Sequence, residues 1–233
     1  MNIAVQKVLT LGHVGMGTGE VAPFDALYEN GLLVTPDDIK AGKIDALIIW
    51  GGGDISPTIY NEPLGPRTGA GIELSHRDRV EVEACRAAIE MNIPIIGICR
   101  GAQLLCALAG GKLVQDVSGH AGSDHSIDTN KGHRWVTSSV HHQMMYPWDI
   151  EHELIAWSTE NRSRDYLGVD ARRMQNILSV DEVWGGDQPD YIEPEIVYFP
   201  KIKGLAIQGH PEFMRPNDPF VKYCLILVQE YLM

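Results

Sequence analysis

Short apolar runs that end at turns recur along the chain. Three of them cover residues 5–11, 46–50 and 93–98. A continuous apolar strand is buried on both faces, as in a parallel sheet that helices cover. Between the second and third runs, apolar residues recur at helical spacing: Val80, Ala84, Ala87 and Met91. The pattern predicts a strand–helix–strand unit with a right-handed crossover.

The last part of the chain has the pattern of a helix. Asp218 and Pro219 fit an N-cap followed by proline at the first helical position. The apolar face of this helix is formed by Phe220, Tyr223, Cys224, Leu227, Val228 and Tyr231. We expect the helix to pack on the sheet. Two other segments, about 119–132 and 184–194, are polar and glycine-rich, which predicts loops.

Length and composition predict one compact, folded domain. The 233 residues are 44% hydrophobic and 21% charged, as in ordinary globular proteins. A net charge of −12 disfavours direct binding to nucleic acid or to anionic lipid. No apolar stretch approaches the roughly 20 residues that cross a bilayer, and the first residues lack the features of a secretion signal. A cytoplasmic protein with reduced cysteines is therefore expected.

The segment 95–105 carries the main candidate for chemistry. It reads Ile-Ile-Gly-Ile-Cys-Arg-Gly-Ala-Gln-Leu-Leu, which predicts a strand, a Gly-x-Cys-x-Gly turn and a helix. Small residues on both sides allow a sharp turn that lifts a nucleophile above the sheet edge. The helix dipole would favour the Cys99 thiolate, and the Arg100 amide could donate to an oxyanion. A lone cysteine after a core strand is usually a packing residue, but the flanking glycines favour a nucleophile.

A base for this thiol is present after the apolar run 205–207, in the sequence Gln-Gly-His-Pro-Glu. On an extended segment, His210 and Glu212 point to the same side. Glu212 could then orient the imidazole while its other nitrogen faces Cys99. The chain order of nucleophile, histidine and acid differs from that of serine α/β hydrolases, in which the acid precedes the histidine.

Four motifs, in this order, resemble those of class I glutamine amidotransferase domains. They are Gly-Gly-Gly-Asp-Ile-Ser-Pro at 51–57, Gly-Ile-Cys-Arg-Gly-Ala-Gln-Leu-Leu at 97–105, Ser-Val-His-His-Gln at 139–143 and Gly-His-Pro-Glu at 209–212. Their details are most similar to the branch that contains γ-glutamyl-γ-aminobutyrate hydrolases. The resemblance implies a flavodoxin-like three-layer α/β sandwich with a mostly parallel central sheet, as one domain over residues 1–233. The active site would lie at the carboxyl ends of the strands.

The resemblance also implies roles for individual residues. Cys99, His210 and Glu212 match a triad that hydrolyses a γ-glutamyl amide through a γ-glutamyl thioester. Gly53 and Arg100 match the residues whose backbone amides form the oxyanion hole. Substrate binding, partly through main-chain atoms, is implied for Gln103, His141, His142 and Gln143. No cofactor and no metal are expected.

Three functions remain open at this stage. The chain could be a glutaminase subunit that feeds ammonia to a separate synthetase, because no synthetase domain fits in this length. It could be a free-standing hydrolase of γ-glutamyl amines, or a catalytically silent binding or regulatory protein on the same fold. Ser138 and Ser139 stand where the hydrolase branch often has Asn-Ser, which leaves the leaving-group specificity open.

Other polar segments have plainer interpretations. His120 and His125 are five residues apart without a cysteine or an HExxH frame, so polar loop histidines near the active-site rim are favoured over a metal site. The glycine-rich segment 12–19 lacks the ending of a phosphate loop, which favours a mobile loop. The acidic residues between Asp181 and Glu195 are expected to form a solvated face, with a docking surface for a basic partner as the alternative.

Overall fold

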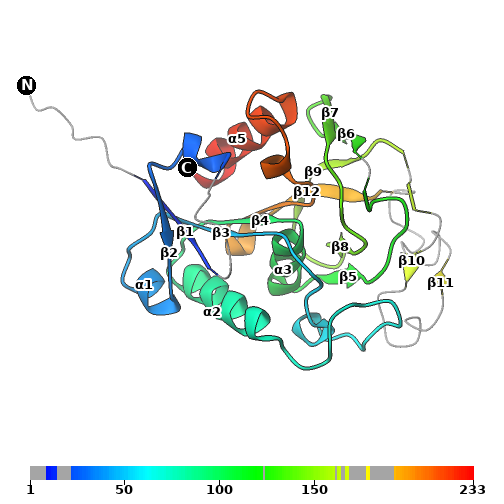
Figure 1. Ribbon diagram of the computed structural model, residues 1–233, viewed down its shortest axis with the longest axis horizontal. Coiled ribbons are helices and arrows are strands. Elements are labelled where there is room, and N and C mark those ends of the chain that lie inside the picture. Colours follow the sequence, from blue (N-terminus) through cyan, green and yellow to red (C-terminus); the bar gives the residue numbers. More distant parts are fainter. Residues whose placement is uncertain are drawn as a thin grey trace, which may run out of the picture.

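A computed structural model shows a mixed β-sheet with helices on both faces (Figure 1). It describes residues 9–14, 22–122, 124–160, 162–163, 166–167, 177–178 and 192–233. The remaining residues include Trp184 and most of the segments 12–19 and 184–194, so the predictions for these segments lie outside the described residues.

The central sheet of the described chain has the strand order β2-β1-β3-β4-β13-β12-β9-β6-β7. The strands are β1 (Thr10–His13), β2 (Asn30–Leu33), β3 (Ala46–Ile49), β4 (Ile95–Ile98), β6 (His125–Thr129), β7 (Arg134–Thr137), β9 (Glu153–Ser158), β12 (Pro194–Phe199) and β13 (Gly204–Ile207). From β2 to β13 all pairings are parallel. From β13 to β7 all pairings are antiparallel. Two small ribbons pair β5 (Lys112–Val114) with β8 (Met144–Tyr146) and β10 (Tyr166–Leu167) with β11 (Ile177–Leu178).

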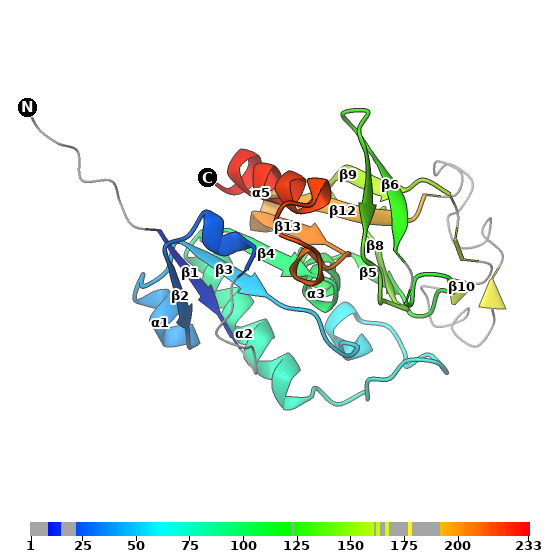
Figure 2. The same cartoon turned by 45° about the horizontal axis from the view of Figure 1, so that its top comes forward.

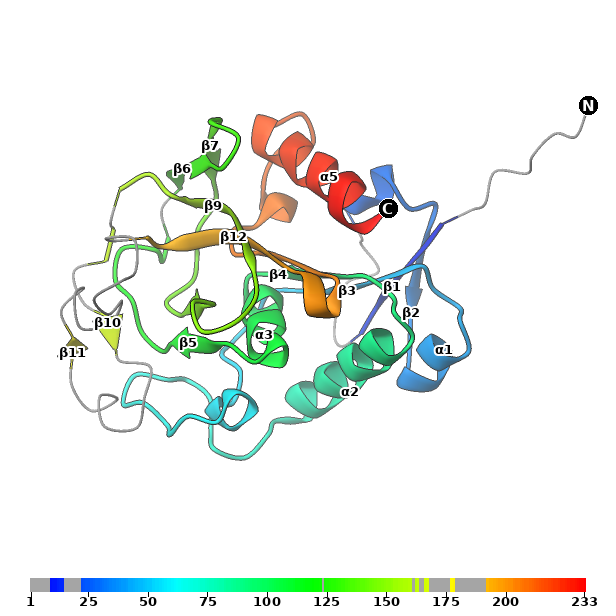
Figure 3. The same ribbon diagram turned by 180° about the vertical axis from the view of Figure 1, so that it is seen from behind.

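Helices cover both faces of the parallel half. The helices are α1 (Pro36–Lys40), α2 (His76–Glu90), α3 (Arg100–Ala109) and α5 (Pro219–Leu232), with short 3-10 turns η1 (Phe24–Ala26), η2 (Pro57–Tyr60), η3 (Pro200–Ile202) and η4 (Pro211–Phe213). Helices α1, α2 and α3 lie on one face and α5 lies on the other (Figures 2 and 3). Each face has its own apolar core, one containing Ile39, Ala84 and Leu104 and the other Phe220 and Leu227. The predicted three-layer, flavodoxin-like fold is confirmed.

Both predicted helices form where their patterns indicate. The Asp218 carboxylate accepts a hydrogen bond from the Phe220 amide and caps α5. Helix α2 buries Ala84 and Ala87 against the sheet. Met91 was wrongly predicted on this apolar face, because it follows the helix and is 42% exposed. In the described ranges, no helix has both the length and the apolar character needed to span a membrane.

Two polar segments are more ordered and more buried than predicted. The glycine-rich segment 119–132 contains strand β6, so the loop prediction for it is wrong. Its inward positions alternate along the strand as His125, Ile127 and Thr129. The predicted solvated acidic face is wrong for Glu193 and Glu195, which are 0% and 1% exposed. Both acids face buried histidines, which the local sequence pattern does not reveal.

A substitution at Gly101 tests how closely α3 packs on the sheet. A Cβ atom at this position would lie 2.1 Å from the carbonyl oxygen of Ile49 in β3. We expect Gly101→Ala to lower the free energy of unfolding in urea by about 1–3 kcal/mol, because backbone cannot move aside as a side chain can. The matched control is Gly71→Ala, whose Cβ would meet nothing closer than 3.9 Å. Equal unfolding midpoints for the two variants would contradict this packing.

Candidate active site

The backbone turns sharply at Cys99, between β4 and α3. Cys99 has φ 49° and ψ −104°, a conformation that residues with a side chain rarely adopt. It forms the N-cap of α3, and it is only 5% exposed. Strain of this kind persists only where the surrounding structure holds it, and it concentrates at functional sites. The predicted nucleophile turn is thus present in the geometry of the backbone.

The two glycines that flank this turn are required by close packing. A Cβ atom at Gly97 would lie 2.5 Å from the carbonyl oxygen of Gly101, and one at Gly101 would meet Ile49. Any larger residue at either position would push the first turn of α3 away from β3 and β4. The Gly-x-Cys-x-Gly spacing therefore has a steric cause.

The candidate base lies beside Cys99 because their strands are neighbours. Strands β4 and β13 are parallel, with Ile98 paired to Ile207, so the residues after them meet at one sheet edge. The Cys99 amide donates a hydrogen bond of 2.8 Å to the carbonyl oxygen of Ile207. Gly51, after β3, borders both side chains: a Cβ there would lie 2.7 Å from Cε1 of His210 and 3.5 Å from Cβ of Cys99.

Three groups hold the imidazole of His210. Its Nδ1 lies 2.6 Å from the Glu212 carboxylate. The ring stacks on Phe213 with 4.5 Å between centroids and 4° between planes. The Ser138 hydroxyl donates to the His210 carbonyl oxygen and accepts from its amide, at 2.8 and 3.2 Å. Glu212 lies in the 3-10 turn η4 and not on an extended segment, so the predicted pair forms through a different backbone geometry.

The electrostatic surroundings of His210 favour the imidazolium ion. Burial lowers its pKa, but the neighbouring Cys99 and Glu212 side chains outweigh this effect and raise the pKa of His210 to about 9. The other ring nitrogen, Nε2, does not face Glu212. Within the described chain it has no partner at normal hydrogen-bond geometry. It is available to exchange a proton with the thiol.

Gly53 and Arg100, the predicted oxyanion-hole residues, line one cavity of about 300 Å³. The Arg100 side chain points away from this role and is buried in ion pairs. It donates to Asp78 at 2.6 Å and to Glu81, both in α2. The side chain therefore anchors the turn after Cys99 to α2, which leaves only the main chain of Arg100 for an oxyanion.

Arg77 was not predicted as a site residue, although it holds the loop that follows β3. Its Nη2 donates to the carbonyl oxygens of Trp50 and Gly51 at 3.0 and 2.9 Å. Its Nε donates to Glu81, the same carboxylate that binds Arg100. The sequence spacing of Arg77 and Glu81 indicates an ion pair within a helix, but only the fold shows that the pair reaches the glycine loop.

The residues matched to substrate binding form one connected group, with His142 apart. The Gln143 carbonyl oxygen lies 3.1 Å from Nε2 of Gln103 and 2.9 Å from Nδ1 of His141. These three side chains are buried. His142 is partly exposed, and its ring lies between Asp54 and Asp116, whose carboxylates raise its pKa. Gln103 lies in α3, and the structure places His141 and Gln143 next to it. His142 lies at the surface.

Three histidines of the histidine-rich middle are buried, so the interpretation as polar histidines at a rim is wrong for His120, His125 and His141. His120, His125 and His141 gather around Glu195, with Glu193 behind His120. Burial lowers the pKa of His141. Burial also lowers the pKa of His120, but the carboxylates of Glu193 and Glu195 outweigh this effect and raise it to about 9.

The other three cysteines are packing residues, as predicted. Cys85, Cys106 and Cys224 are buried and form no disulfide. Burial raises the pKa of all three thiols, that of Cys106 to about 12. Neutral thiols are weak nucleophiles, so these residues are unsuited to acyl transfer.

Comparison with known proteins agrees with this geometry. The model of the family described as Peptidase C26 matches residues 37–163, more than half of the chain. The chain belongs to the Peptidase C26 family. The resemblance to class I glutamine amidotransferases is thereby confirmed, and the chain is a member of a hydrolase-type enzyme family.

Individual relatives match over shorter segments. YvdE of Lactococcus lactis subsp. lactis, named as glutamine amidotransferase-like, is 44% identical over 75 residues, which are 32% of this chain and 31% of YvdE. The carbamoyl phosphate synthase small chain of Vibrio cholerae is 41% identical over 61 residues, 26% of this chain and 16% of that protein. The chain thus spans less than a third of the length of either relative.

A solved structure extends the likeness to nearly the whole fold. The glutamine amidotransferase of Thermotoga maritima has a TM-score of 0.54, covering 97% of this chain and 86% of that chain at 12% identity. At this level of identity the match shows the fold alone.

The ionisation of His210 provides a test of the Cys99–His210–Glu212 arrangement. We expect an NMR titration of the His210 ring to give a pKa of about 9 and the Glu212→Gln variant to give a lower value, because the neutral amide no longer stabilises the imidazolium. In the unfolded chain, the pKa of a histidine side chain is about 6.5. A raised folded pKa stabilises the fold below pH about 6.5, and this contribution is lost as the pH rises towards about 9. Glu212→Gln should therefore flatten the pH dependence of the unfolding free energy in this window.

The control for this titration is Glu151→Gln, an exposed glutamate outside the site. It should leave both the His210 titration and the stability profile unchanged. A wild-type His210 that titrates near 6.5 would show that the imidazole is not held between Cys99 and Glu212.

Proposed function

We propose that the chain hydrolyses a γ-glutamyl amide, either glutamine or a γ-glutamyl amine, by cysteine-dependent acyl transfer. The observation that carries the proposal is the strained Cys99 turn beside the His210–Glu212 pair at one sheet edge. Membership of the Peptidase C26 family supports it. The proposal treats residues 1–233 as one catalytic domain located in the cytoplasm.

In the proposed reaction, the Cys99 thiolate attacks the γ-carbonyl carbon of the substrate. His210, charged in this surrounding, donates its proton to the leaving nitrogen as the carbon–nitrogen bond breaks. A γ-glutamyl thioester and ammonia or an amine result. Water then attacks the thioester, His210 takes one of its protons, and glutamate leaves as the sulfur returns to the thiolate. Glu212 keeps the imidazole oriented in both steps.

The oxyanion that forms in both steps needs donors. The backbone amides of Gly53 and Arg100 are proposed for this role, since Arg100 directly follows Cys99 and Gly53 lies in the loop after β3, the strand beside β4. Gln103, His141 and Gln143 are proposed to hold the amino-acid end of the substrate, His141 and Gln143 partly through main-chain atoms. Their position next to α3 supports this assignment.

Two destinations of the leaving group are compatible with this site. A glutaminase subunit would deliver ammonia to a separate synthetase, and one relative is named as the small chain of carbamoyl phosphate synthase. A free-standing hydrolase would release an amine directly. A catalytically silent binding protein on this fold is the alternative of another class.

Glutamate release tests the proposal. We expect the wild-type chain to release glutamate from glutamine or from a γ-glutamyl amine, and Cys99→Ala to lose roughly 10³-fold or more of this turnover, because the attacking sulfur is removed. The control is Cys106→Ala, which removes a buried packing thiol and should keep turnover within a few-fold. Release from a γ-glutamyl amine by the chain alone indicates the hydrolase. Release from glutamine only after a synthetase is added indicates the subunit.

Covalent labelling of Cys99 tests the alternative that the chain is a catalytically silent binding protein. An electrophilic glutamine analogue should modify Cys99 in the wild-type chain, as found by peptide mass spectrometry. No labelling together with no glutamate from any substrate would overturn the proposal.

Arg77 is proposed as a positioning residue for the glycine loop. We expect Arg77→Met to reduce kcat about 10-fold with little change in KM, because the carbonyl oxygens of Trp50 and Gly51 lose their donor and the loop amides become less well aligned. Arg77→Lys should recover part of the loss. The matched control is Arg79→Met, in the same helix, where the lost contact is only to the Leu74 carbonyl oxygen. A parallel rise in KM, or the same kcat loss in the control, would indicate a merely structural role.

A further inference from the structure

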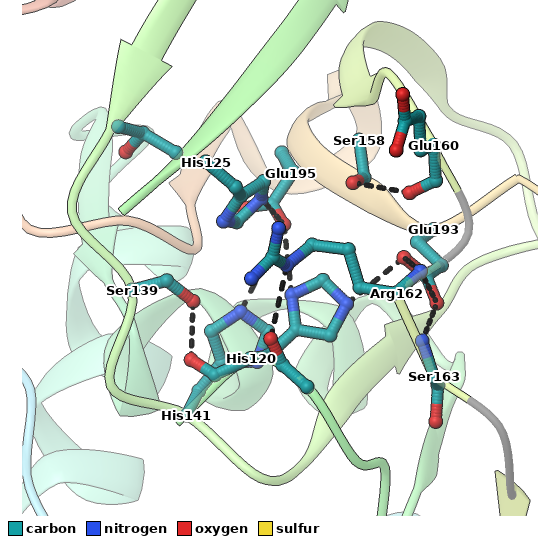
Figure 4. A network of polar contacts seen from close by, with 12 residues as sticks. His120, His125, Ser139, His141, Ser158, Glu160, Arg162, Ser163, Glu193 and Glu195 are labelled. Atoms are coloured by element: carbon teal, nitrogen blue, oxygen red, sulfur yellow. Dashed lines mark hydrogen bonds and ion pairs between the residues drawn. The ribbon is translucent and has the colours of Figure 1, made fainter. Parts of the chain in front are cut away.

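Three histidines and one glutamate meet at a buried point in the antiparallel half of the molecule. His125 begins β6 and Glu195 lies in β12, while His120 and His141 lie in the loops before β6 and before β8. In Figure 4 these side chains gather around one point. None is more than 5% exposed. Three separate parts of the chain, at 120–125, 141 and 195, thus bring nitrogen and oxygen donors together in an enclosed place.

Hydrogen bonds on the outer side fix two of the imidazole rings. Nε2 of His120 lies 2.9 Å from the Glu193 carboxylate. Nδ1 of His141 lies 2.9 Å from the Gln143 carbonyl oxygen. A carbonyl oxygen only accepts, so this Nδ1 carries the hydrogen, and in the neutral ring Nε2 keeps its lone pair. Metal-binding histidines are typically oriented in this way, by a carboxylate or a backbone carbonyl on the other ring nitrogen.

The inner nitrogen atoms face one carboxylate oxygen. Nδ1 of His120, Nε2 of His125 and Nε2 of His141 lie 3.4, 2.9 and 3.8 Å from Oε1 of Glu195. Within the described chain, neither Nε2 of His141 nor Oε2 of Glu195 has a hydrogen-bond partner. A buried lone pair that faces an anion is unfavourable. A cation at the centre would remove this conflict.

Distances and donor types indicate which cation fits. Zinc bonds of about 2.0–2.1 Å in a tetrahedron place the ligand atoms roughly 3.3 Å apart. The three distances to Glu195 bracket this value. Imidazole nitrogen with a single carboxylate suits zinc better than magnesium or calcium, which prefer oxygen ligands. Glu193 and Glu195, both fully buried, together balance a divalent charge.

We propose that His120, His125 and Glu195, whose ligand atoms lie within 4.8 Å of one another, bind one zinc ion. His141 would move inward as the fourth ligand, and Glu193 orients His120. Four protein ligands fill a tetrahedral site, so the ion would be structural and would bind no reacting water. A surface cavity of about 320 Å³ borders the site at His125, and its lining includes Asp124, Glu160 and Arg162. The sequence around His120 and His125 does not reveal this site, because Glu195 follows His125 by 70 residues.

The zinc ion would also hold the segment 141–143. The Gln143 carbonyl oxygen bonds both His141, a proposed ligand, and Gln103 in α3. Zinc would thus tie the antiparallel half of the sheet to the helix that begins at Cys99. This last link to substrate binding rests on the proposed function, but the zinc site itself does not.

Metal analysis of the whole chain tests the zinc site. After treatment with a chelator, dialysis against micromolar zinc and removal of free metal, we expect about one zinc per wild-type chain by mass spectrometry of the metal. Cobalt(II) in its place should give the intense visible absorption of a four-coordinate site. Glu195→Gln and His125→Asn should each weaken zinc binding roughly 100-fold or more, and Glu193→Gln about 10–100-fold. His133→Asn, an exposed histidine beyond β6, is the control and should bind as the wild type does.

The wild-type chain alone can overturn the proposal, even if the variants do not fold. Zinc content below about a tenth per chain, or a melting temperature that does not rise when zinc is added, would contradict it. Equal zinc content in a folded Glu195→Gln variant would also contradict it. Protons on the imidazoles, and Arg162, which Figure 4 draws beside the cluster, would then supply the positive charge. None of these measurements uses glutamate release, so a failed zinc site and a failed acyl transfer are distinguishable.

Discussion

The sharp turn at Cys99 is the constraint on which the rest of this structure depends. A residue with a side chain occupies a backbone region that usually requires glycine, and it remains there because both ends of the turn are clamped. Strand β4 is fixed between β3 and β13, and the first turn of α3 rests on the backbone of β3 through Gly101. Relaxing the turn would require moving a helix out of the core.

Ion pairs connect the Cys99 turn to the glycine loop that follows β3. Arg100 follows Cys99 directly, and Glu81 binds both Arg100 and Arg77. Arg77 in turn holds the carbonyl oxygens after β3. Burying such charges is costly unless each has a partner, and here each pair also fixes a piece of backbone. The Glu81 carboxylate thereby links the turn at the candidate nucleophile to the glycine loop.

The sequence predicted those parts of the fold and site that depend on neighbouring residues. The helix after Asp218 and the elbow around Cys99 follow from caps, periodicity and small residues within a few positions. Strand β6 was missed because its buried positions include the polar residues His125 and Thr129, and the partner of His125, Glu195, lies 70 residues further along the chain. Ser138 and Arg77 were missed for the same reason, since their partners lie 72 and up to 27 residues away.

The pairing of β4 with β13 has a consequence for how the protein is made. Cys99 leaves the ribosome more than 100 residues before His210, which follows the strand that pairs with β4. Long-range pairings of this kind form late in folding because a long loop must close first. While the chain is being synthesised, the Cys99 thiol therefore lacks its candidate base, His210. The candidate nucleophile and its candidate base thus come together only after β13 has been made and has paired with β4.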